Sequence, residues 1–295
     1  MSAHIIDGKA IAESVLAEVG RRAQTLRETK GVQPGLAVIL VGDNPASQVY
    51  VRTKHQTCER MGFLSEVYRL PADAPQEEVA ALITRLNSDG RIHGILLQMP
   101  LPDHLNEQFL LELIDPRKDV DGFHPVNAGR LALGLPGFVP CTPLGVRELL
   151  VRSGWDPAGR FTVIVGRSNI VGRPLALLLM RKQRGSDATV CVCHSRTPNL
   201  AALARQADIL VAAIGKARFV TADMIKPGAA VIDVGINRIE DPTKKSGHRL
   251  VGDVDFDAAR EVAGAITPVP GGVGPMTIAM LMHNTVQAAE AQSEE

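Results

Sequence analysis

The spacing of apolar residues changes several times along the first part of the chain. Between Ile11 and Val19, and again between Val79 and Leu86, apolar residues recur every three or four positions, as on one face of a helix. Leu36–Val41 is instead a continuous apolar run, as expected for a parallel strand covered on both faces. The predicted helices run from Asp7 to Gly31, from Ser47 to Met61 and onward from Pro75, and the predicted strands are 36–41, 64–70 and 94–99. This alternation predicts a parallel α/β sheet.

Turn-forming residues dominate the stretch from Gly134 to Pro143 and indicate a domain junction. Beyond it the rhythm restarts, with a helix over 144–153, a helix from Pro275 to about Ala289, and strands near 162–165, 189–193, 209–213, 230–234 and 250–251. The polar tail 288–295 is expected to fray. We therefore expect a first domain over 1–143, on which the helix of 275–295 packs back, and a doubly wound, Rossmann-like domain over 144–274.

Composition and charge narrow the function classes. The 295 residues suit two domains, and 45% hydrophobic with 22% charged residues is typical of globular proteins. The formal net charge is zero, so bulk electrostatics do not point to nucleic acid or to an anionic membrane. The N-terminus lacks the pattern of a signal peptide, and no apolar run is long enough to span a bilayer. We expect a cytoplasmic protein with neither of these partners.

The cysteines predict free thiols and no metal site. Cys58, Cys141, Cys191 and Cys193 contain no C-x-x-C pair, and the last two lie in an alternating, strand-like run. Buried free thiols are typical of a reducing compartment.

A glycine turn at Gly166 joins a predicted strand to a predicted helix, whose N-terminus can bind a phosphate. The sequence departs from the dinucleotide fingerprint G-x-G-x-x-G, because Ser168 and Val171 stand at its second and third glycine positions and Gly172 follows one place later. The motif alone could be an ordinary strand–helix turn.

The end of the next predicted strand bears on the choice of coenzyme. It reads His194-Ser195-Arg196-Thr197 and lacks the acidic residue that binds the ribose of NAD. With Arg167 in the glycine turn, Ser195 and Arg196 favour the 2′-phosphate of NADP. The alternative is a solvated pair of arginines.

Polar residues follow two predicted strands of the first domain. Tyr50 and Lys54 are four positions apart and share one helix face, where a partly desolvated lysine can act as a general acid or base. Gln98 is the one polar residue of the apolar strand 94–99, at the same sheet edge. The alternatives are a solvated helix face and an amide satisfied by a nearby loop.

Two further motifs contain turn-forming residues. Lys118-Asp119-Val120-Asp121-Gly122 lacks the later acid of a calcium loop, so we interpret one carboxylate as a ligand hook and the other as structural. A capped turn is the alternative. Thr267–Thr277 is dense in glycine and proline before a helix, which predicts a stiff loop with close backbone approach, and otherwise a linker.

Together and in this order, the motifs closely resemble the methylenetetrahydrofolate dehydrogenase/cyclohydrolase family. The resemblance extends from Asp7 to Met282 and rests on Y-V-x-x-K, Q-x-P-L-P, K-D-V-D-G, P-C-T-P, G-R-S-x-I-V-G-x-P and P-V-P-G-G-V-G-P-M-T. It implies two α/β domains with an active-site cleft between them. It also implies NADP as cofactor, a reduced folate as substrate, and a homodimer formed through the second domain.

The resemblance assigns roles residue by residue. The implied catalytic residues are Lys54, Tyr50 beside it, Gln98, which holds it, and Asp121, which binds the pterin ring. The further implied folate contacts are Leu97, Met99, Pro270, Gly271 and Gly274. The implied coenzyme contacts are Gly166, Arg167, Ser168, Ile170, Ser195, Arg196, Gly215, Ile236 and Thr277.

The implied activity is NADP-dependent oxidation of 5,10-methylenetetrahydrofolate to the methenyl form, followed by hydrolysis to 10-formyltetrahydrofolate, in one-carbon metabolism and purine biosynthesis. Two alternatives stay open. A dehydrogenase of the shikimate type also carries a lysine in its first domain, but Y-V-x-x-K and P-V-P-G-G-V-G-P argue against it. A nucleotide-sensing module would keep the fold without the chemistry, which the retained Lys54, Gln98 and Asp121 argue against.

Overall fold

The computed structural model describes residues 2–244 and 247–294. The chain forms two compact units, each assembled from two stretches of sequence. We name them by their main sheets: the three-stranded unit comprises Ser14–Cys141 and Ile278–Glu295, and the six-stranded unit comprises Met1–Glu13 and Thr142–Thr277. Helices α1 (Gly8–Lys30) and α10 (Val273–Gln292) have residues in both units.

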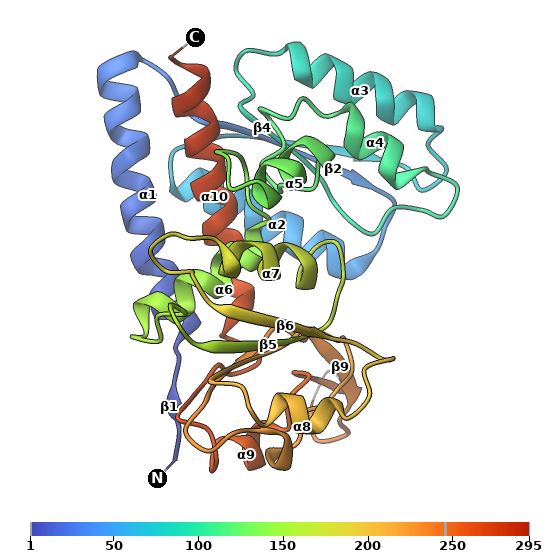
Figure 1. Cartoon of the computed structure of the whole chain (residues 1–295). Helices are drawn as coiled ribbons and strands as arrows, with labels where there is room; N and C mark the ends of the chain where they lie inside the picture. Colours follow the sequence, from blue (N-terminus) through green and yellow to red (C-terminus); the bar gives the residue numbers. More distant parts are fainter. Residues whose placement is uncertain (1, 245–246, 295) are drawn as a thin grey trace. The chain divides into compact units, whose positions relative to one another are not determined.

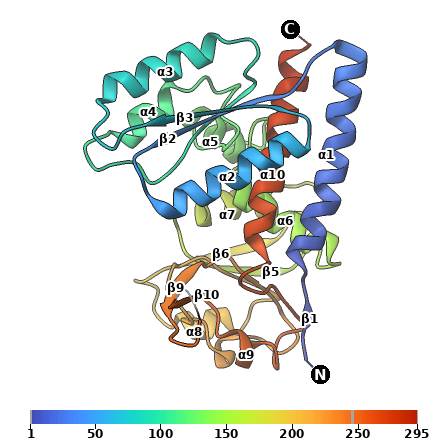
Figure 2. The same cartoon turned by 180° about the vertical axis from the view of Figure 1, so that it is seen from behind.

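The sheet of the three-stranded unit is parallel, in the order β3 (Leu64–Leu70), β2 (Gly35–Val41), β4 (Gly94–Leu97). All seven residues of the central strand are buried, as the continuous apolar run predicts. Ala37, Ile39 and Val41 join one core cluster with the apolar stripe of α3 (Gln76–Ser88). Helix α4 (Glu107–Leu113) covers the same face, and α2 (Pro45–Arg60) covers the other (Figures 1 and 2).

Local sequence explains how the elements of this unit begin and end. Helix α2 begins two residues before its predicted start, because the Asn44 side chain accepts from the amides of Ala46 and Ser47, and Pro45 suits the first turn. Strand β4 ends two residues before its predicted end, where Pro100 supplies no amide donor. Helices α4 and α5 (Pro125–Ala132) were not predicted, since each is too short to show a periodic pattern.

The main sheet of the other unit is also parallel. Its order is β1 (His4–Ile5), β11 (Ala265–Ile266), β8 (Ala230–Asp233), β7 (Ile209–Ala212), β5 (Phe161–Val165), β6 (Thr189–Cys193). Helices α6 (Cys141–Arg152) and α7 (Gly172–Met180) lie on one face, and α8 (Leu200–Ala204) and α9 (Phe256–Ala259) lie on the other (Figure 1). A 3₁₀ turn spans Ala222–Met224.

Three expectations are corrected here. The first 13 residues belong to the six-stranded unit and not to the first domain, because β1 pairs with β11 in that sheet. The predicted strand at 250–251 is part of β10 (His248–Val251), which pairs antiparallel with β9 (Asn237–Glu240) outside the main sheet. The tail is helical as far as Gln292, whose side chain donates to the carbonyls of His93 and Arg117. Glu295 lies outside the described residues.

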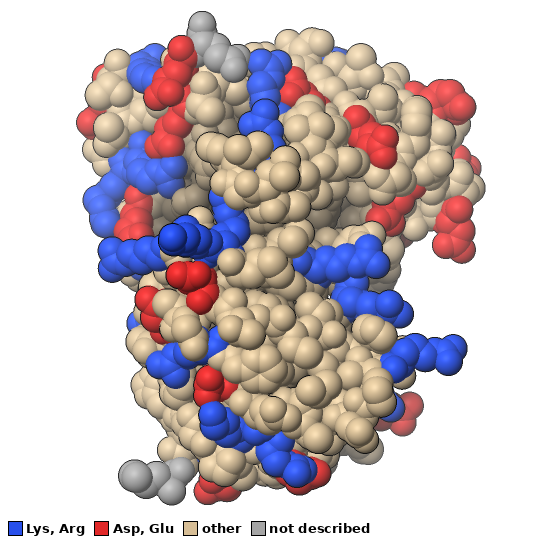
Figure 3. Space-filling model, in the orientation of Figure 1, with Lys and Arg blue, Asp and Glu red and all other residues tan. Residues whose placement is uncertain are grey.

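Charges of both signs are mixed on one face of the molecule, and the four cysteines are free thiols. Lysine and arginine are interspersed with aspartate and glutamate over the face shown in Figure 3, consistent with the zero formal charge. Cys58, Cys141 and Cys193 are buried free thiols, and Cys191 is a half-buried one. Within the described residues, the structure has no helix with the length and apolar character that a membrane crossing requires.

Ile39→Ala should lower the free energy of unfolding by about 3 kcal/mol, because Ile39 is fully buried in the central strand and the change leaves a cavity. Chemical denaturation of the full chain measures this loss. Val49→Ala, at a side chain that is 63% exposed, is the control and should change the value by less than about 0.5 kcal/mol. Equal losses in the two variants would contradict the assigned core.

Candidate functional site

Lys54 occupies a core-facing position of helix α2. The buried residues of this helix recur at helical spacing, at Ser47, Val51, Lys54, Thr57 and Cys58. Lys54 is only 8% exposed, so its amine requires a polar partner. The solvated helix face considered from the sequence is therefore wrong.

Gln98 supplies that partner. Lys54 Nζ donates to Gln98 Oε1 at 2.9 Å. The Gln98 side chain is oriented because its Nε2 donates to the Met99 carbonyl at 2.8 Å, and its backbone amide donates to Ile39 O at 2.9 Å. The Ser47 hydroxyl donates to the same Met99 carbonyl, which ties the start of α2 to this segment. The amide is thus satisfied, and its partner is the lysine.

This pair lies where the strand order reverses. Strand β3 lies on one side of β2. Strand β4, which comes next after β3 in sequence, lies on the other side of β2. Open α/β sheets bind ligands at such a switch point, beyond the carboxyl ends of the strands. Lys54 is on the helix that follows β2, and Gln98 follows β4 directly. Both groups therefore stand at the position where this architecture binds ligands.

The two aspartates of K-D-V-D-G have different surroundings. Asp119 is buried and accepts hydrogen bonds from the amides of Phe123 and His124 and from Asn127 Nδ2, so it is the structural carboxylate. Asp121 is half-buried, and burial raises the pKa of its carboxyl, which the charge of Lys54 opposes. Because its side chain is partly exposed and interacts electrostatically with Lys54, Asp121 is the candidate for binding a ligand.

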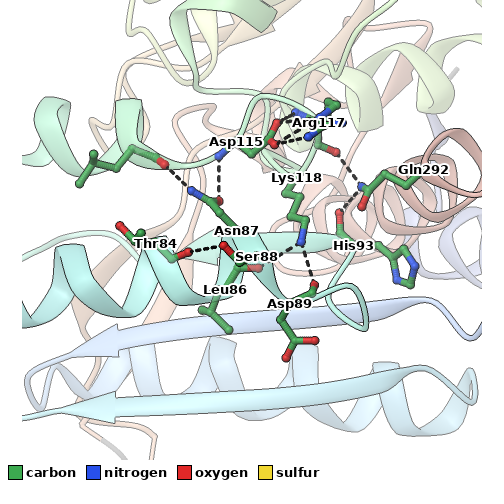
Figure 4. A network of polar contacts seen from close by, with 11 residues as sticks. Thr84, Leu86, Asn87, Ser88, Asp89, His93, Asp115, Arg117, Lys118 and Gln292 are labelled. Atoms are coloured by element: carbon green, nitrogen blue, oxygen red, sulfur yellow. Dashed lines mark hydrogen bonds and ion pairs between the residues drawn. The ribbon is translucent and has the colours of Figure 1, made fainter. Parts of the chain in front are cut away.

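Three polar side chains fix the segment that carries Asp121 through hydrogen bonds to backbone carbonyls. Lys118 Nζ donates to the carbonyls of Leu86 and Asp89 at the end of α3, at 3.1 and 2.8 Å (Figure 4). Gln292 reaches the Arg117 carbonyl from α10. Farther along, Asn284 of α10 donates to the carbonyls of Val120 and Val139, at 2.8 and 3.0 Å.

The remaining predicted residues of this unit flank the pair. Tyr50 is 37% exposed one helical turn before Lys54, and partial burial raises the pKa of its hydroxyl. Leu97 is buried at the end of β4 and Met99 is half-buried. The Met99–Pro100 peptide bond is cis.

The glycine turn after β5 is a close-packed backbone cradle. Gly166 has φ +135°, and a Cβ there would lie 2.1 Å from the Ala213 carbonyl of the loop after β7. A Cβ on Gly172 would lie 2.2 Å from the Gly166 carbonyl, so Gly172 allows α7 to start against the turn. The turn lies between β5 and β7, which is the switch point of this sheet.

The predicted cationic residues of this unit are exposed. The loop after β6 is a tight turn in which His194 N donates to the Thr197 hydroxyl and Arg196 N donates to His194 Nδ1. Arg167, Ser168, Ile170, Ser195 and Arg196 are all exposed. Over residues 2–244 and 247–294, neither Arg167 nor Arg196 forms an ion pair with a carboxylate. Their charges therefore stay available to an anionic ligand.

The glycine- and proline-rich loop leads into α10. Gly271 has φ +110°, the Val269–Pro270 peptide bond is cis, and Pro270 is exposed. A Cβ on Gly8 would lie 1.9 Å from the Gly272 carbonyl, so the start of α1 packs directly on this loop. Gly274 faces Ile236, and Thr277 shares a hydrogen bond of 3.1 Å with Thr142.

Two buried carboxylates of the six-stranded unit, Asp233 and Asp253, were not predicted as site residues. Asp233, at the end of β8, accepts from the amides of Gly235, Asp253 and Val254 at 3.0, 2.9 and 2.9 Å. A Cβ on Gly252 would lie 1.8 Å from Asp233 Oδ2. The sequence signal was Asp233 itself, an acid that ends an apolar strand two residues before Gly235. The same pattern is also found in ordinary turns.

Metal ligation has no structural support. Throughout the part of the chain that the structure describes, no group of three or more His, Cys, Asp or Glu side chains is arranged to hold a metal ion. The expected absence of a metal stays a prediction.

Family models match most of the chain. The model of the catalytic domain of tetrahydrofolate dehydrogenase/cyclohydrolase matches residues 6–121, and the model of its NAD(P)-binding domain matches residues 140–293. The chain belongs to the tetrahydrofolate dehydrogenase/cyclohydrolase family.

Individual members of the family are similar to this chain over nearly its full length. The bifunctional protein FolD of Prosthecochloris aestuarii is 56% identical over 286 residues, covering 96% of this chain and 97% of that protein. The crystal structure of FolD from Campylobacter jejuni has a TM-score of 0.92 at 50% identity, covering 98% of this chain and 99% of that chain. The Trypanosoma brucei enzyme, solved with NADP cofactor and inhibitor, has a TM-score of 0.93 at 42% identity, covering 99% and 98%.

The shikimate alternative has only a likeness of fold. Shikimate 5-dehydrogenase from Thermus thermophilus has a TM-score of 0.50 at 15% identity. The family match therefore decides against it.

Asp233 predicts a pH-dependent contribution to stability. Burial raises the pKa of its carboxyl from 3.8 to about 6, and the neighbouring Asp253 adds to this rise. The folded chain therefore binds this proton more tightly than the unfolded chain. The resulting stabilisation is full below about pH 4 and is lost as the pH rises through about 6, a change of about 3 kcal/mol.

Asp233→Asn should remove this titration. The free energy of unfolding of the wild type minus that of the variant should fall by about 3 kcal/mol between about pH 4 and pH 7. Urea unfolding at several pH values measures the difference. The same curve for Asp257→Asn, at an exposed carboxylate, should be flat. A difference for Asp233→Asn that does not vary with pH would contradict the assignment.

Proposed function

We propose that this chain is a bifunctional enzyme of one-carbon metabolism. It oxidises 5,10-methylenetetrahydrofolate to 5,10-methenyltetrahydrofolate with NADP, and then hydrolyses the methenyl group to give 10-formyltetrahydrofolate. The observation that carries the proposal is the buried Lys54–Gln98 pair at the switch point of the three-stranded sheet, in a chain of this family.

The residues of the three-stranded unit bind the folate and handle its protons. Asp121 accepts hydrogen bonds from the pterin ring, and Tyr50 packs beside the ring, assisted by Leu97 and Met99. Loss of hydride from the methylene carbon leaves a delocalised cation, which a charged ammonium nearby would repel. The neutral amine of Lys54 is therefore the favourable form during this step.

Hydrolysis then uses the same amine. Water attacks the amidinium carbon of the methenyl cation and loses both of its protons as the formyl carbonyl forms. One proton passes to the ring nitrogen that departs, and the other is released to solvent. Lys54 Nζ can relay the proton that the nitrogen gains, because the hydrogen bond that it donates to Gln98 Oε1 fixes its position. Gln98 is thus a positioning group whose own orientation comes from Met99 O.

The six-stranded unit fits a dinucleotide. The backbone cradle at Gly166 leaves no room for a side chain, the N-terminus of α7 follows it, and Arg167 and Arg196 are exposed and unpaired among the described residues. We assign Arg167, Ser195 and Arg196 to the 2′-phosphate, and Gly166, Ser168, Ile170, Gly215, Ile236 and Thr277 to the rest of the coenzyme. NADP supplies the hydride acceptor when bound.

The proposal also covers the remaining folate contacts, the oligomeric state, the location of the protein and the use of its product. Pro270, Gly271 and Gly274 stay predicted folate contacts. We further propose a homodimer formed through the coenzyme-binding unit, a cytoplasmic location, and a product that serves purine biosynthesis. Size-exclusion chromatography with light scattering tests the dimer.

Lys54→Met should lower the rate of methenyltetrahydrofolate hydrolysis at least about 100-fold, because it removes the proton-relaying amine and keeps the aliphatic chain. Loss of methenyl absorbance measures this step, and NADPH formation from methylenetetrahydrofolate measures the oxidation. Gln56→Met, at an exposed position two residues along the helix, is the control and should keep both activities. Undiminished hydrolysis by Lys54→Met would overturn the role of the lysine, and an inactive wild type would overturn the function.

Arg167→Ala should weaken the binding of NADP about 10- to 100-fold and that of NAD much less, because only NADP carries the 2′-phosphate. Michaelis constants for both coenzymes measure the effect. Arg173→Ala removes an exposed arginine that donates to Asn169 on the same segment, and should affect both coenzymes equally and weakly. Equal losses for both coenzymes in Arg167→Ala would reject its assignment.

A further inference from the structure

We propose that Asp253 is a positioning residue for the coenzyme. Its buried carboxylate joins the loops that follow strands β7 and β8, and thereby sets the affinity for NADP. The inference rests on the proposed function, because Gly215 and Ile236 are assigned there as coenzyme contacts.

One oxygen of Asp253 holds the loop after β7. Oδ2 accepts from the backbone amides of Ile214 and Gly215, at 2.7 and 2.9 Å. Strand β7 ends at Ala212, so these amides have left the sheet and need another acceptor. Asp253 supplies it, and Gly215 is thereby fixed at the carboxyl edge next to the Gly166 cradle.

The other oxygen holds the loop after β8. Oδ1 accepts from Asn237 Nδ2 at 2.9 Å. Asn237 directly follows Ile236, whose side chain is 50% exposed. A Cβ on Gly235 would lie 2.2 Å from Oδ1, so glycine is required for the carboxylate to approach this backbone. One carboxylate therefore ties together the loops after two adjacent strands of the sheet.

The carboxylate is itself held rigidly. Asp253 is fully buried, and its backbone amide donates to Asp233 Oδ1 at 2.9 Å. The amide of Asp233 donates to the Thr267 hydroxyl at 2.8 Å. Asp253 is thus linked to Asp233 at the end of β8, and through Asp233 to Thr267, which directly follows β11.

The donor arrangement favours a carboxylate at this position. Three N–H groups converge on two oxygens, and both oxygens must accept. An asparagine would present its NH₂ group either to the two backbone amides or to Asn237, which could accept it only by turning its own amide so that Oδ1 faces position 253. Asp253→Asn therefore replaces charge-assisted hydrogen bonds by neutral ones at best, while changing the shape of the side chain very little.

The swap Asp253→Asn/Asn237→Asp restores the pattern with the same net charge. The new amide oxygen can accept from Ile214 and Gly215, and its NH₂ group can donate to the new carboxylate at position 237. The control is Asp257→Asn, which removes an exposed carboxylate four residues along the chain.

The experiment measures four properties of the full chain: NADP affinity by equilibrium titration, dehydrogenase kinetics at varied NADP, cyclohydrolase rate with methenyltetrahydrofolate and no coenzyme, and thermal unfolding. Asp253→Asn should bind NADP at least about tenfold more weakly, with a matching rise in the Michaelis constant for NADP. Its cyclohydrolase rate should stay within about twofold of the wild type, since that step needs no coenzyme. The swap should recover affinity to within about threefold of the wild type.

Several outcomes would overturn the positioning role. These are a folded Asp253→Asn variant with NADP affinity within about twofold of the wild type, an equal loss of both activities, or a swap that binds no better than the single variant. If Asp253→Asn does not fold, Asn237→Ala removes one donor and should weaken NADP about threefold, and unchanged affinity rejects the role. A wild type that binds no NADP would instead reject the proposed function.

Discussion

Lys54 lies on the buried face of helix α2, and a buried amine is stable only with a hydrogen-bond partner. Gln98 meets this requirement at 2.9 Å, and Gln98 is in turn fixed by Ile39 O and Met99 O. The pair therefore couples a helix that follows one strand to the end of another strand. Asp121, Tyr50 and the folate chemistry proposed for this unit all depend on that coupling.

In the six-stranded unit, buried carboxylates accept hydrogen bonds from backbone amides that have no partner in the sheet. Parallel strands place their carboxyl ends at one edge, where the backbone leaves the sheet and its amides lose their ladder partners. Asp233 and Asp253 accept from these amides and fix the loops. In both units, a rigid sheet fixes the position of each loop's start, and buried polar side chains determine the conformation that follows.

Much of this organisation could be predicted from the sequence. Apolar periodicity located the long helices and central strands, and the order of strands and helices placed Lys54 and Gln98 at one sheet edge. Two-residue strands such as β1 and β11 lack any periodic signal, so the membership of the first 13 residues could not be predicted. The spacing of Asp119 and Asp121 does not distinguish their roles, and only the family resemblance singled out Asp121 from the sequence. The hydrogen bonds that Asp119 accepts supply the physical reason for its structural role.

Close contacts with the buried carboxylates of Asp253 and Asp233 require glycine at positions 235 and 252. Gly235 and Gly252 each leave space that an aspartate oxygen fills, with hypothetical Cβ distances of 2.2 and 1.8 Å. The spacing Asp-x-Gly at 233–235, followed by Gly-Asp at 252–253, therefore indicates two buried carboxylates that fix neighbouring loops, and not merely two flexible turns. The dinucleotide fingerprint does not include this second pattern. A search that scores both together could recognise a coenzyme fold in chains whose first glycine turn is as irregular as this one.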